Sequence, residues 1–483
     1  MKNVALSVVL ACASMACAST QSAPATTAGS VTTTASEPGK APTIATQPVE
    51  AKVSQRPWLG AAAASQFVLV GGQPQFVGVW VDVPKGESRE HVPMSVTLTI
   101  DTSGSMAGDK MDHARHAAST LVRQMQDGDM IAIHEFNNSA REIVGPMVLG
   151  PHSRAQLLRV IAKLQPAGST NMEEGLGLAL RSAQATPSTH PVRRVVLISD
   201  GRATVGQTNA HVLGSIAEHA APSGVQVTSL GVGLDYDEET LNQLAVRSSG
   251  RLYHLADSRE MAGILETELA LLQSTMGTNA FVELVPAPGV RLHSVGGVRT
   301  EWGQNGALRV PLGTVFGGQR RELLVRFSLM DEQVEGSRPI MSARLHFNDP
   351  SDGGVPRVHE AIVRAERTTD AALVQSHPNP AVQAIVAMQE AADIAAAARK
   401  QVDDGRFDEA DLALSRAEKQ LRDNAALAKS PAERERMTAA AKRVSASRHS
   451  VQEVKAAPAP ARAKAARASS LQLNDAAMEA RGF

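Results

Sequence analysis

Residues 96–105 read VTLTIDTSGS, an apolar strand-like run followed at once by an acid and two serines. In an open parallel sheet, ligands bind beyond the carboxyl ends of the strands, so this run would place Asp101, Ser103 and Ser105 around one point. A carboxylate and two hydroxyls are hard oxygen donors of the kind that Mg²⁺ or Ca²⁺ prefers. The stretch therefore predicts a strand of an α/β sheet that ends in a divalent-cation site.

Two later segments can complete this site. Residues 168–171 read GSTN and offer the hydroxyl of Thr170, while residues 195–201 read VVLISDG and end an apolar run at Asp200. Because Asp101 and Asp200 both end strands, we expect both at the same edge of the sheet. Two acids, three neutral hydroxyls and water would leave a bound cation with residual positive charge and an exchangeable position. An acidic side chain from a partner protein could take that position.

Residues 95–273 alternate strand-like and helix-like patterns. Strand patterns fall at 130–136, 195–199 and 225–232, with amphipathic segments between them. Such alternation predicts a doubly wound, mostly parallel α/β sheet. The first helix shows its apolar face at three- and four-residue spacing. That face consists of Met111, Ala114, Ala118, Leu121, Val122 and Met125.

The ordered set Asp-x-Ser-x-Ser, Thr and Asp resembles the metal-ion-dependent adhesion site of the von Willebrand factor A (vWA) domain family. The resemblance assigns Asp101, Ser103, Ser105, Thr170 and Asp200 to the metal site, with the serines as direct ligands and the acids often acting through water. It implies a Rossmann-like fold, a divalent cation (Mg²⁺ preferred, Mn²⁺ or Ca²⁺ as alternatives) and a protein ligand that presents an acidic side chain. A helix-capping network without metal is the alternative for these residues, since Ser and Asp also cap helices.

Strand patterns with turn signals flank this domain on both sides and predict a β-sandwich. Before it, 67–70 and 76–83 are separated by Gly71-Gly72 and are typical of a β-hairpin. The layout is similar to inter-alpha-trypsin-inhibitor-like and chloride-channel-like bacterial vWA surface proteins. The expected divisions are a signal peptide at 1–17, a disordered linker at 18–56, sandwich strands at 57–94, the vWA domain at 95–273, further sandwich strands at 278–366, a helical hairpin at 370–426, and a helical and then disordered tail at 427–483.

The N-terminus carries an apolar targeting segment and the only two cysteines of the chain, Cys12 and Cys17. A cysteine after small residues is typical of bacterial lipoprotein processing. We expect lipid attachment at Cys17, with Cys12 as the alternative, and ordinary signal cleavage remains a further alternative. The expected location is the bacterial cell envelope, lipid-anchored with the outer membrane favoured, or else secreted or periplasmic.

Composition and motifs argue against several other functions. A formal net charge of −1 and 3% aromatic residues give no basis for nucleic-acid binding. Residues 201–208 read GRATVGQT and echo a phosphate-binding loop, but Gln207 stands where the lysine is needed, so we expect no nucleotide. We expect a binding protein without enzymatic activity. The alternatives are a metal-assisted hydrolase that uses Glu173 or Glu174 as its base, and a transport or channel accessory protein suggested by the layout.

Overall fold

A computed structural model of the chain describes residues 57–85, 91–331, 336–428 and 430–480. The predicted signal peptide and linker, with Cys12 and Cys17, lie outside these residues. In the described ranges no helix is long and apolar enough to cross a membrane.

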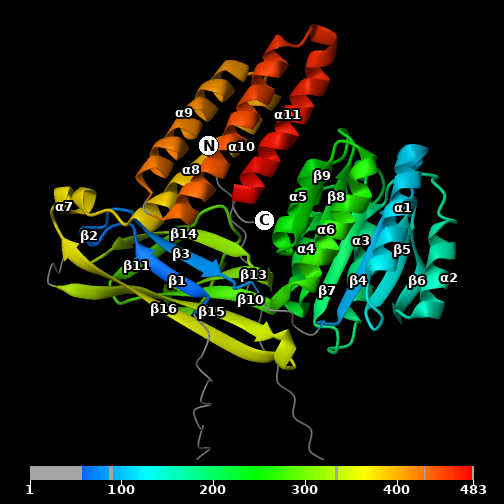
Figure 1. The fold of residues 1–483 in the computed structure, drawn as a ribbon, viewed down its shortest axis with the longest axis horizontal. Helices are drawn as coiled ribbons and strands as arrows, with labels where there is room; N and C mark the ends of the chain where they lie inside the picture. Colours follow the sequence, from blue (N-terminus) through cyan, green and yellow to red (C-terminus); the bar gives the residue numbers. More distant parts are fainter. Residues whose placement is uncertain (1–56, 86–90, 332–335, 429, 481–483) are drawn as a thin grey trace, which may run out of the picture. The chain divides into compact units, whose positions relative to one another are not determined.

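The α/β domain is built on a six-stranded sheet with the order β6-β5-β4-β7-β8-β9 (Figure 1). All neighbours are parallel except β6, which runs antiparallel to β5 at one edge. β4 is buried along its whole length and β7 at every residue except the half-buried Arg193, as expected for strands covered by helices on both faces. The strands are β4 (Met94–Asp101), β5 (Met130–Phe136), β6 (Ala140–Val148), β7 (Val192–Ser199), β8 (Val225–Val232) and β9 (Arg251–Leu255).

Helices cover both faces of this sheet, which confirms the predicted doubly wound fold. Alternate residues of a strand point to opposite faces, so Val196 and Ile198 pack with α1, α2 and α6 while Val195 and Leu197 pack with α3, α4 and α5. The helices are α1 (Asp109–Gln124), α2 (Pro151–Ile161), α3 (Met172–Gln184), α4 (Ala210–Ala220), α5 (Glu238–Arg247) and α6 (Met261–Gln273), with short 3₁₀ turns η1 (Gly104–Met106), η2 (Ala221–Ser223) and η3 (Ser258–Glu260).

Strands from before and after the α/β domain together form the predicted sandwich. One sheet has the order β1-β3-β14-β11 and the other the order β12-β13-β10-β15-β16-β2. Apolar side chains of both sheets share one core, so the α/β domain is an insertion between strands of a single sandwich. The strands are β1 (Leu59–Ala63), β2 (Phe67–Leu69), β3 (Gln75–Asp82), β10 (Thr275–Pro286), β11 (Val290–Val295), β12 (Glu301–Trp302), β13 (Leu308–Phe316), β14 (Arg320–Leu329), β15 (Ser337–Asp349) and β16 (Val355–Thr368), with 3₁₀ turns η4 (Gln304–Gly306) and η5 (Pro350–Asp352).

The predicted β-hairpin of residues 67–83 is wrong, although both of its strands exist. β2 pairs in parallel with β16, and β3 pairs with β1 and β14 in the other sheet. β3 gains eight paired positions along β14, from Gln75 to Asp82, which the three-residue β2 could not offer. Longer pairing elsewhere therefore outweighs the local turn signal.

The C-terminal region consists of α7 (Ala371–Ser376), α8 (Pro380–Asp403), α9 (Phe407–Leu427), α10 (Pro431–Ala456) and α11 (Ala459–Ala480). The predicted hairpin is α8 and α9. The prediction of a disordered end is wrong for residues 459–480, because α11 buries Leu471 and Leu473. Leu473 joins an alanine-rich core shared by α8 to α11, and Leu471 joins the α/β core beside α3 to α5. Helices lined by alanine can pack closely with few large side chains. The Ala-rich composition of this region therefore did not indicate a packed helix.

Candidate metal centre

The two predicted acids lie side by side at the carboxyl edge of the sheet. β4 ends at Asp101 and β7 ends at Ser199, immediately before Asp200, and the parallel register pairs Ile100 with Ile198. The exposed fractions of Asp101 and Asp200 are 0% and 2%. Two carboxylates held this close and this deep need positive charge or hydrogen-bond donors around them.

Neutral donors hold Asp101. Its Oδ1 accepts a hydrogen bond from the backbone N–H of Ser103 at 2.8 Å, and its Oδ2 accepts from Ser199 Oγ at 2.6 Å. Burial is the main cause that raises the pKa of Asp101, and the charge of Asp200 raises it further, while the hydrogen bonds oppose both. An added cation would favour the ionised carboxylate.

The serine hydroxyls connect this strand end to Asp200. Ser103 Oγ lies 3.0 Å from Ser105 Oγ, and Ser105 Oγ donates to Asp200 Oδ1 at 2.7 Å. Ser105 is exposed on the turn η1 and Ser103 is buried. The chain of contacts therefore runs from the interior to the surface and ends at a hydroxyl that solvent or a partner can reach.

Thr170 reaches the same place from the loop before α3. Two hydrogen bonds with Thr204 fix the backbone of Thr170. The backbone N–H of Thr170 donates to Thr204 Oγ1 at 3.0 Å, and the backbone N–H of Thr204 donates to the carbonyl of Thr170 at 2.9 Å. A β-carbon built on Gly201 would lie 3.5 Å from Ser105 Oγ and 3.8 Å from Thr170 Oγ1. Both hydroxyls therefore flank one point, and the structure brings all five predicted residues together.

Lys110 is a member of this cluster that the sequence reasoning missed. It is the second residue of α1, and its Nζ lies 2.5 Å from Asp200 Oδ2. A cation in the first turn of a helix opposes the helix dipole, which favours acids there. That mismatch, five residues after Ser105, is the signal that could have identified Lys110 as a residue with a buried partner.

The donor set fits a hard divalent cation. It offers two carboxylates and three hydroxyls, with neither imidazole nor thiolate, which is the chemistry of Mg²⁺, Mn²⁺ and Ca²⁺ sites. In the parts of the chain that the structure describes, no group of three or more His, Cys, Asp or Glu residues could hold a metal ion. The cluster therefore differs from zinc sites and from acid-rich calcium cages.

Glu173 and Glu174, the bases of the hydrolase alternative, have other partners. Glu173 Oε2 accepts from the backbone N–H of Gln207 at 2.8 Å, and Glu174 Oε2 accepts from that of Ala140 at 3.0 Å. Each carboxylate thus braces a loop beside α3. A general base must be within reach of the proton that it removes, and these two are engaged with the backbone instead.

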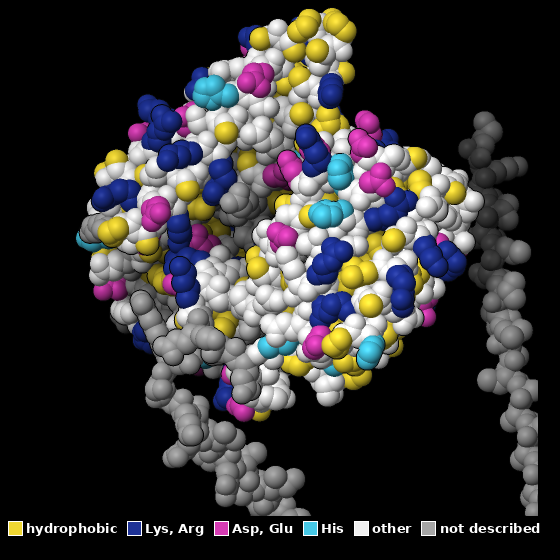
Figure 2. Space-filling model, turned by 45° about the vertical axis from the view of Figure 1, so that its right-hand side comes forward, with side chains coloured by type: hydrophobic (Ala, Val, Ile, Leu, Met, Phe, Trp, Pro, Cys, Tyr) yellow, Lys and Arg dark blue, Asp and Glu magenta, His cyan; other side chains and the backbone are white. Residues whose placement is uncertain are grey.

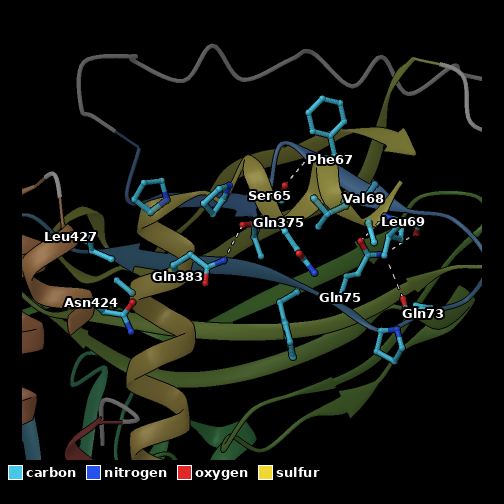
Figure 3. A pocket seen from close by; sticks show the side chains of 18 of the residues that line it. Ser65, Phe67, Val68, Leu69, Gln73, Gln75, Gln375, Gln383, Asn424 and Leu427 are labelled. Carbon is cyan, nitrogen blue, oxygen red and sulfur yellow. Dashed lines mark hydrogen bonds between the residues drawn. The ribbon is translucent and has the colours of Figure 1, made fainter. Parts of the chain in front are cut away.

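A separate cavity of about 760 Å³ lies against β2, β3 and the helices α7 to α9 (Figure 3). The side-chain amide of Gln75 points to β2, where it accepts from Leu69 N–H at 2.6 Å and donates to Leu69 O at 2.8 Å. The amide thus takes the place of a neighbouring strand. None of the metal-centre residues lines this cavity, whose polar lining includes Ser65, Gln73, Gln75, Gln375, Gln383 and Asn424.

Surface charge is mixed on the face that Figure 2 displays. Lys and Arg side chains there are interspersed with acidic and apolar ones. This distribution agrees with the formal net charge of −1.

Comparison with known proteins identifies the α/β domain. Residues 95–267 match the von Willebrand factor type A domain family, so the chain contains a vWA domain. The inter-alpha-trypsin inhibitor heavy chain H2 of Mesocricetus auratus is 28% identical over 203 residues, which cover 41% of this chain and 22% of that protein. The uncharacterized protein sll0103 of Synechocystis is 25% identical over 272 residues, which cover 54% of this chain and 63% of that protein. The chain therefore spans about a fifth of the heavy chain's length.

A solved structure shares the fold beyond the vWA domain. The von Willebrand factor type A protein from Catenulispora acidiphila superposes with a TM-score of 0.69 and 18% identity, over 88% of this chain and 98% of that one. The shared coverage exceeds residues 95–267, so it takes in flanking sandwich or helical regions as well. At this identity the likeness concerns the fold alone.

Proposed function

We propose that this chain is a binding protein that holds an acidic side chain of a partner protein through a divalent cation, with Mg²⁺ preferred over Mn²⁺ or Ca²⁺. The observation that carries the proposal is the meeting of Asp101, Ser103, Ser105, Thr170 and Asp200 at one edge of the vWA sheet. The presence of a vWA domain supports a role in protein binding or adhesion.

Each residue of the centre has a distinct part in this proposal. Ser103, Ser105 and Thr170 supply neutral oxygens to the cation, and the two acids supply the negative charge that keeps it there. A cation bound with only two carboxylates would supply residual positive charge and a position for a partner's carboxylate. Ser105, the exposed member, marks the side from which a partner would approach.

We propose a non-catalytic role for this centre. Hydrolysis would need a base close to a metal-bound water, and Glu173 and Glu174 are engaged with the backbone of neighbouring loops. The same metal centre without a base suits adhesion, scaffolding or assembly of a complex.

We also propose that the protein is anchored in the bacterial cell envelope by a lipid on Cys17, with Cys12 as the alternative. The support is the apolar N-terminal segment with the only cysteines of the chain. Mass spectrometry of the protein purified from a bacterial membrane fraction tests this proposal. A diacylglyceryl mass on an N-terminal cysteine would support it, and an unmodified, cleaved N-terminus in the soluble fraction would contradict it.

Calorimetric titration of Mg²⁺, Mn²⁺ and Ca²⁺ into the full chain tests the metal proposal. We expect saturable binding that a Ser103→Ala/Ser105→Ala double variant loses. A Ser153→Ala/Ser215→Ala variant is the matched control, since these serines lie on α2 and α4, away from the metal centre. Binding that persists in the double variant, or no binding by the parent protein, would contradict the proposal.

A further inference from the structure

The two acids of the metal centre are neutralised in different ways. Asp101 takes hydrogen bonds from the Ser103 backbone and the Ser199 hydroxyl, both uncharged. Asp200 takes one hydrogen bond from Ser105 and one ionic contact from the ammonium of Lys110. Both oxygens of Asp200 are therefore engaged, one by a neutral group and one by a full positive charge.

The Lys110 side chain reaches Asp200 from the solvent side. Its exposed fraction is 35%, whereas the carboxylate of Asp200 is fully buried. The end of its stem lies near the backbone of Gly233, just past β8, where a built β-carbon would be 3.9 Å from both Cε and Nζ. The ammonium thus lies between the ends of β7 and β8, on a flexible side chain that can withdraw into solvent.

We propose that Lys110 is a tethered counter-ion that competes with the divalent cation for Asp200 and so sets the metal affinity of this vWA domain. The inference rests on the proposed function, because it concerns regulation of the same centre. A divalent cation and an ammonium cannot share one carboxylate without strong repulsion between like charges. Metal binding must therefore displace Lys110, and the cost of breaking its ion pair weakens binding.

The same pair has a second consequence for the protein without metal. Asp200 is buried, and a buried carboxylate without a counter-charge is destabilising. Lys110 therefore keeps the centre folded when the divalent cation is scarce. A neutral residue at position 110 makes the centre depend on metal for its stability.

The test is calorimetric titration of Mg²⁺ into the full chain and into Lys110→Met, which keeps the apolar stem and removes the charge. We expect Lys110→Met to bind Mg²⁺ at least about tenfold more tightly, because no ammonium must be displaced. Lys110→Arg should remain as weak as the parent protein. Lys419→Met is the matched control for a lost surface lysine, since Lys419 is exposed on α9, and its affinity should be unchanged.

Thermal unfolding with and without a chelator gives an independent readout. In chelator, Lys110→Met should melt below the parent protein, and excess Mg²⁺ should raise its midpoint by more than it raises that of the parent. Lys110→Gln should repeat both effects if Lys110→Met folds poorly. These results together would establish Lys110 as the competing counter-ion.

The outcomes separate the inference from the proposed function. Equal or weaker Mg²⁺ binding by Lys110→Met, with binding by the parent protein intact, would overturn the role of Lys110 and leave the metal centre standing. Absence of Mg²⁺ binding from the parent and from every Lys110 variant would overturn both. If Lys110→Met binds Mg²⁺ tightly, and adding Ser103→Ala/Ser105→Ala to it abolishes that binding, the result would support both the role of Lys110 and the metal centre.

Discussion

Glu268 of α6 is the counter-charge of the buried Arg194 of β7. Arg194 Nε lies 3.4 Å from Glu268 Oε1, and the exposed fractions of the two residues are 1% and 2%. Thr228 donates to the same Glu268 oxygen at 2.6 Å, and Tyr253 donates to the other at 2.9 Å. One carboxylate thus joins α6 to three neighbouring strands of the vWA sheet.

We expect Glu268→Gln to destabilise the protein by about 3 kcal/mol, because it leaves Arg194 buried without a counter-charge. Urea unfolding followed by circular dichroism measures the change. Glu266→Gln is the control, because Glu266 lies exposed on the same helix, and it should cost less than about 1 kcal/mol. A similar cost for both variants would show that the buried pair contributes no special stability.

The meeting of Asp101 and Asp200 was predictable because both acids stand at the ends of strands that the sequence shows plainly. Asp101 ends the strand-like run 96–101, Asp200 follows the run 195–199, and parallel strands bring such ends together regardless of how far apart they are in the chain. Lys110 was not predictable in the same way. Its partner lies 90 residues away, and the contact depends on where α1 begins and how the helix is rotated on the sheet.

The errors in the fold prediction have a common physical cause. The turn at Gly71-Gly72 indicates a change of direction, but β2 before it pairs with β16 and β3 after it pairs with β14, both of which are longer strands that come more than about 230 residues later. The end of the chain shows few large apolar residues, yet Leu471 and Leu473 are enough to place α11 against two cores. Strand pairing between distant segments, and helix packing through only two large apolar residues, give little signal in the local sequence.

The burial of Leu471 gives a prediction for α11. Leu471→Ala should destabilise the protein by about 2–4 kcal/mol, since it removes a buried side chain and leaves a cavity. Leu427→Ala should change stability by less than about 0.5 kcal/mol, because Leu427 is 78% exposed at the end of α9. Urea unfolding of both variants checks the difference. Equal stability of the two would contradict the docked position of α11.

His134 gives the protein a dependence on pH. Burial, with a smaller contribution from the charge of Arg181, lowers the pKa of His134 to about 4, and its Nε2 lies 3.8 Å from the half-exposed Glu142. As the pH falls, His134 in the unfolded chain therefore binds a proton near the ordinary histidine pKa of about 6.5, whereas His134 in the folded protein does so only at lower pH. The stability from this residue is complete above pH 6.5 and falls by about 1.4 kcal/mol per pH unit as the pH drops toward 4.

His134→Gln isolates this contribution from other titrating groups. The difference in unfolding free energy between the parent protein and the variant should change with that slope between pH 6.5 and 4, and stay constant above pH 7. Urea unfolding at each pH provides the measurement. A constant difference across the whole range would mean that His134 does not resist protonation in the folded protein.

Gly201 gives a steric test of the metal centre. A methyl group at this position would lie 3.5 Å from Ser105 Oγ and 3.8 Å from Thr170 Oγ1, which is ordinary contact for the protein alone. The methyl would nevertheless fill space between two proposed metal ligands. Gly201→Ala should therefore keep its thermal midpoint in chelator and lose at least about tenfold in Mg²⁺ affinity, or about 1.4 kcal/mol.

Gly263→Ala is the matched control for Gly201→Ala. A β-carbon at Gly263 meets no atom within 4 Å, and alanine in the interior of α6 should raise stability by about 0.5–1 kcal/mol without changing Mg²⁺ binding. Calorimetric titration and thermal unfolding of both variants separate the steric effect from a general effect of the added methyl. Unchanged Mg²⁺ affinity in Gly201→Ala would place the cation away from Ser105 and Thr170, and would remove the geometric basis of the proposed centre.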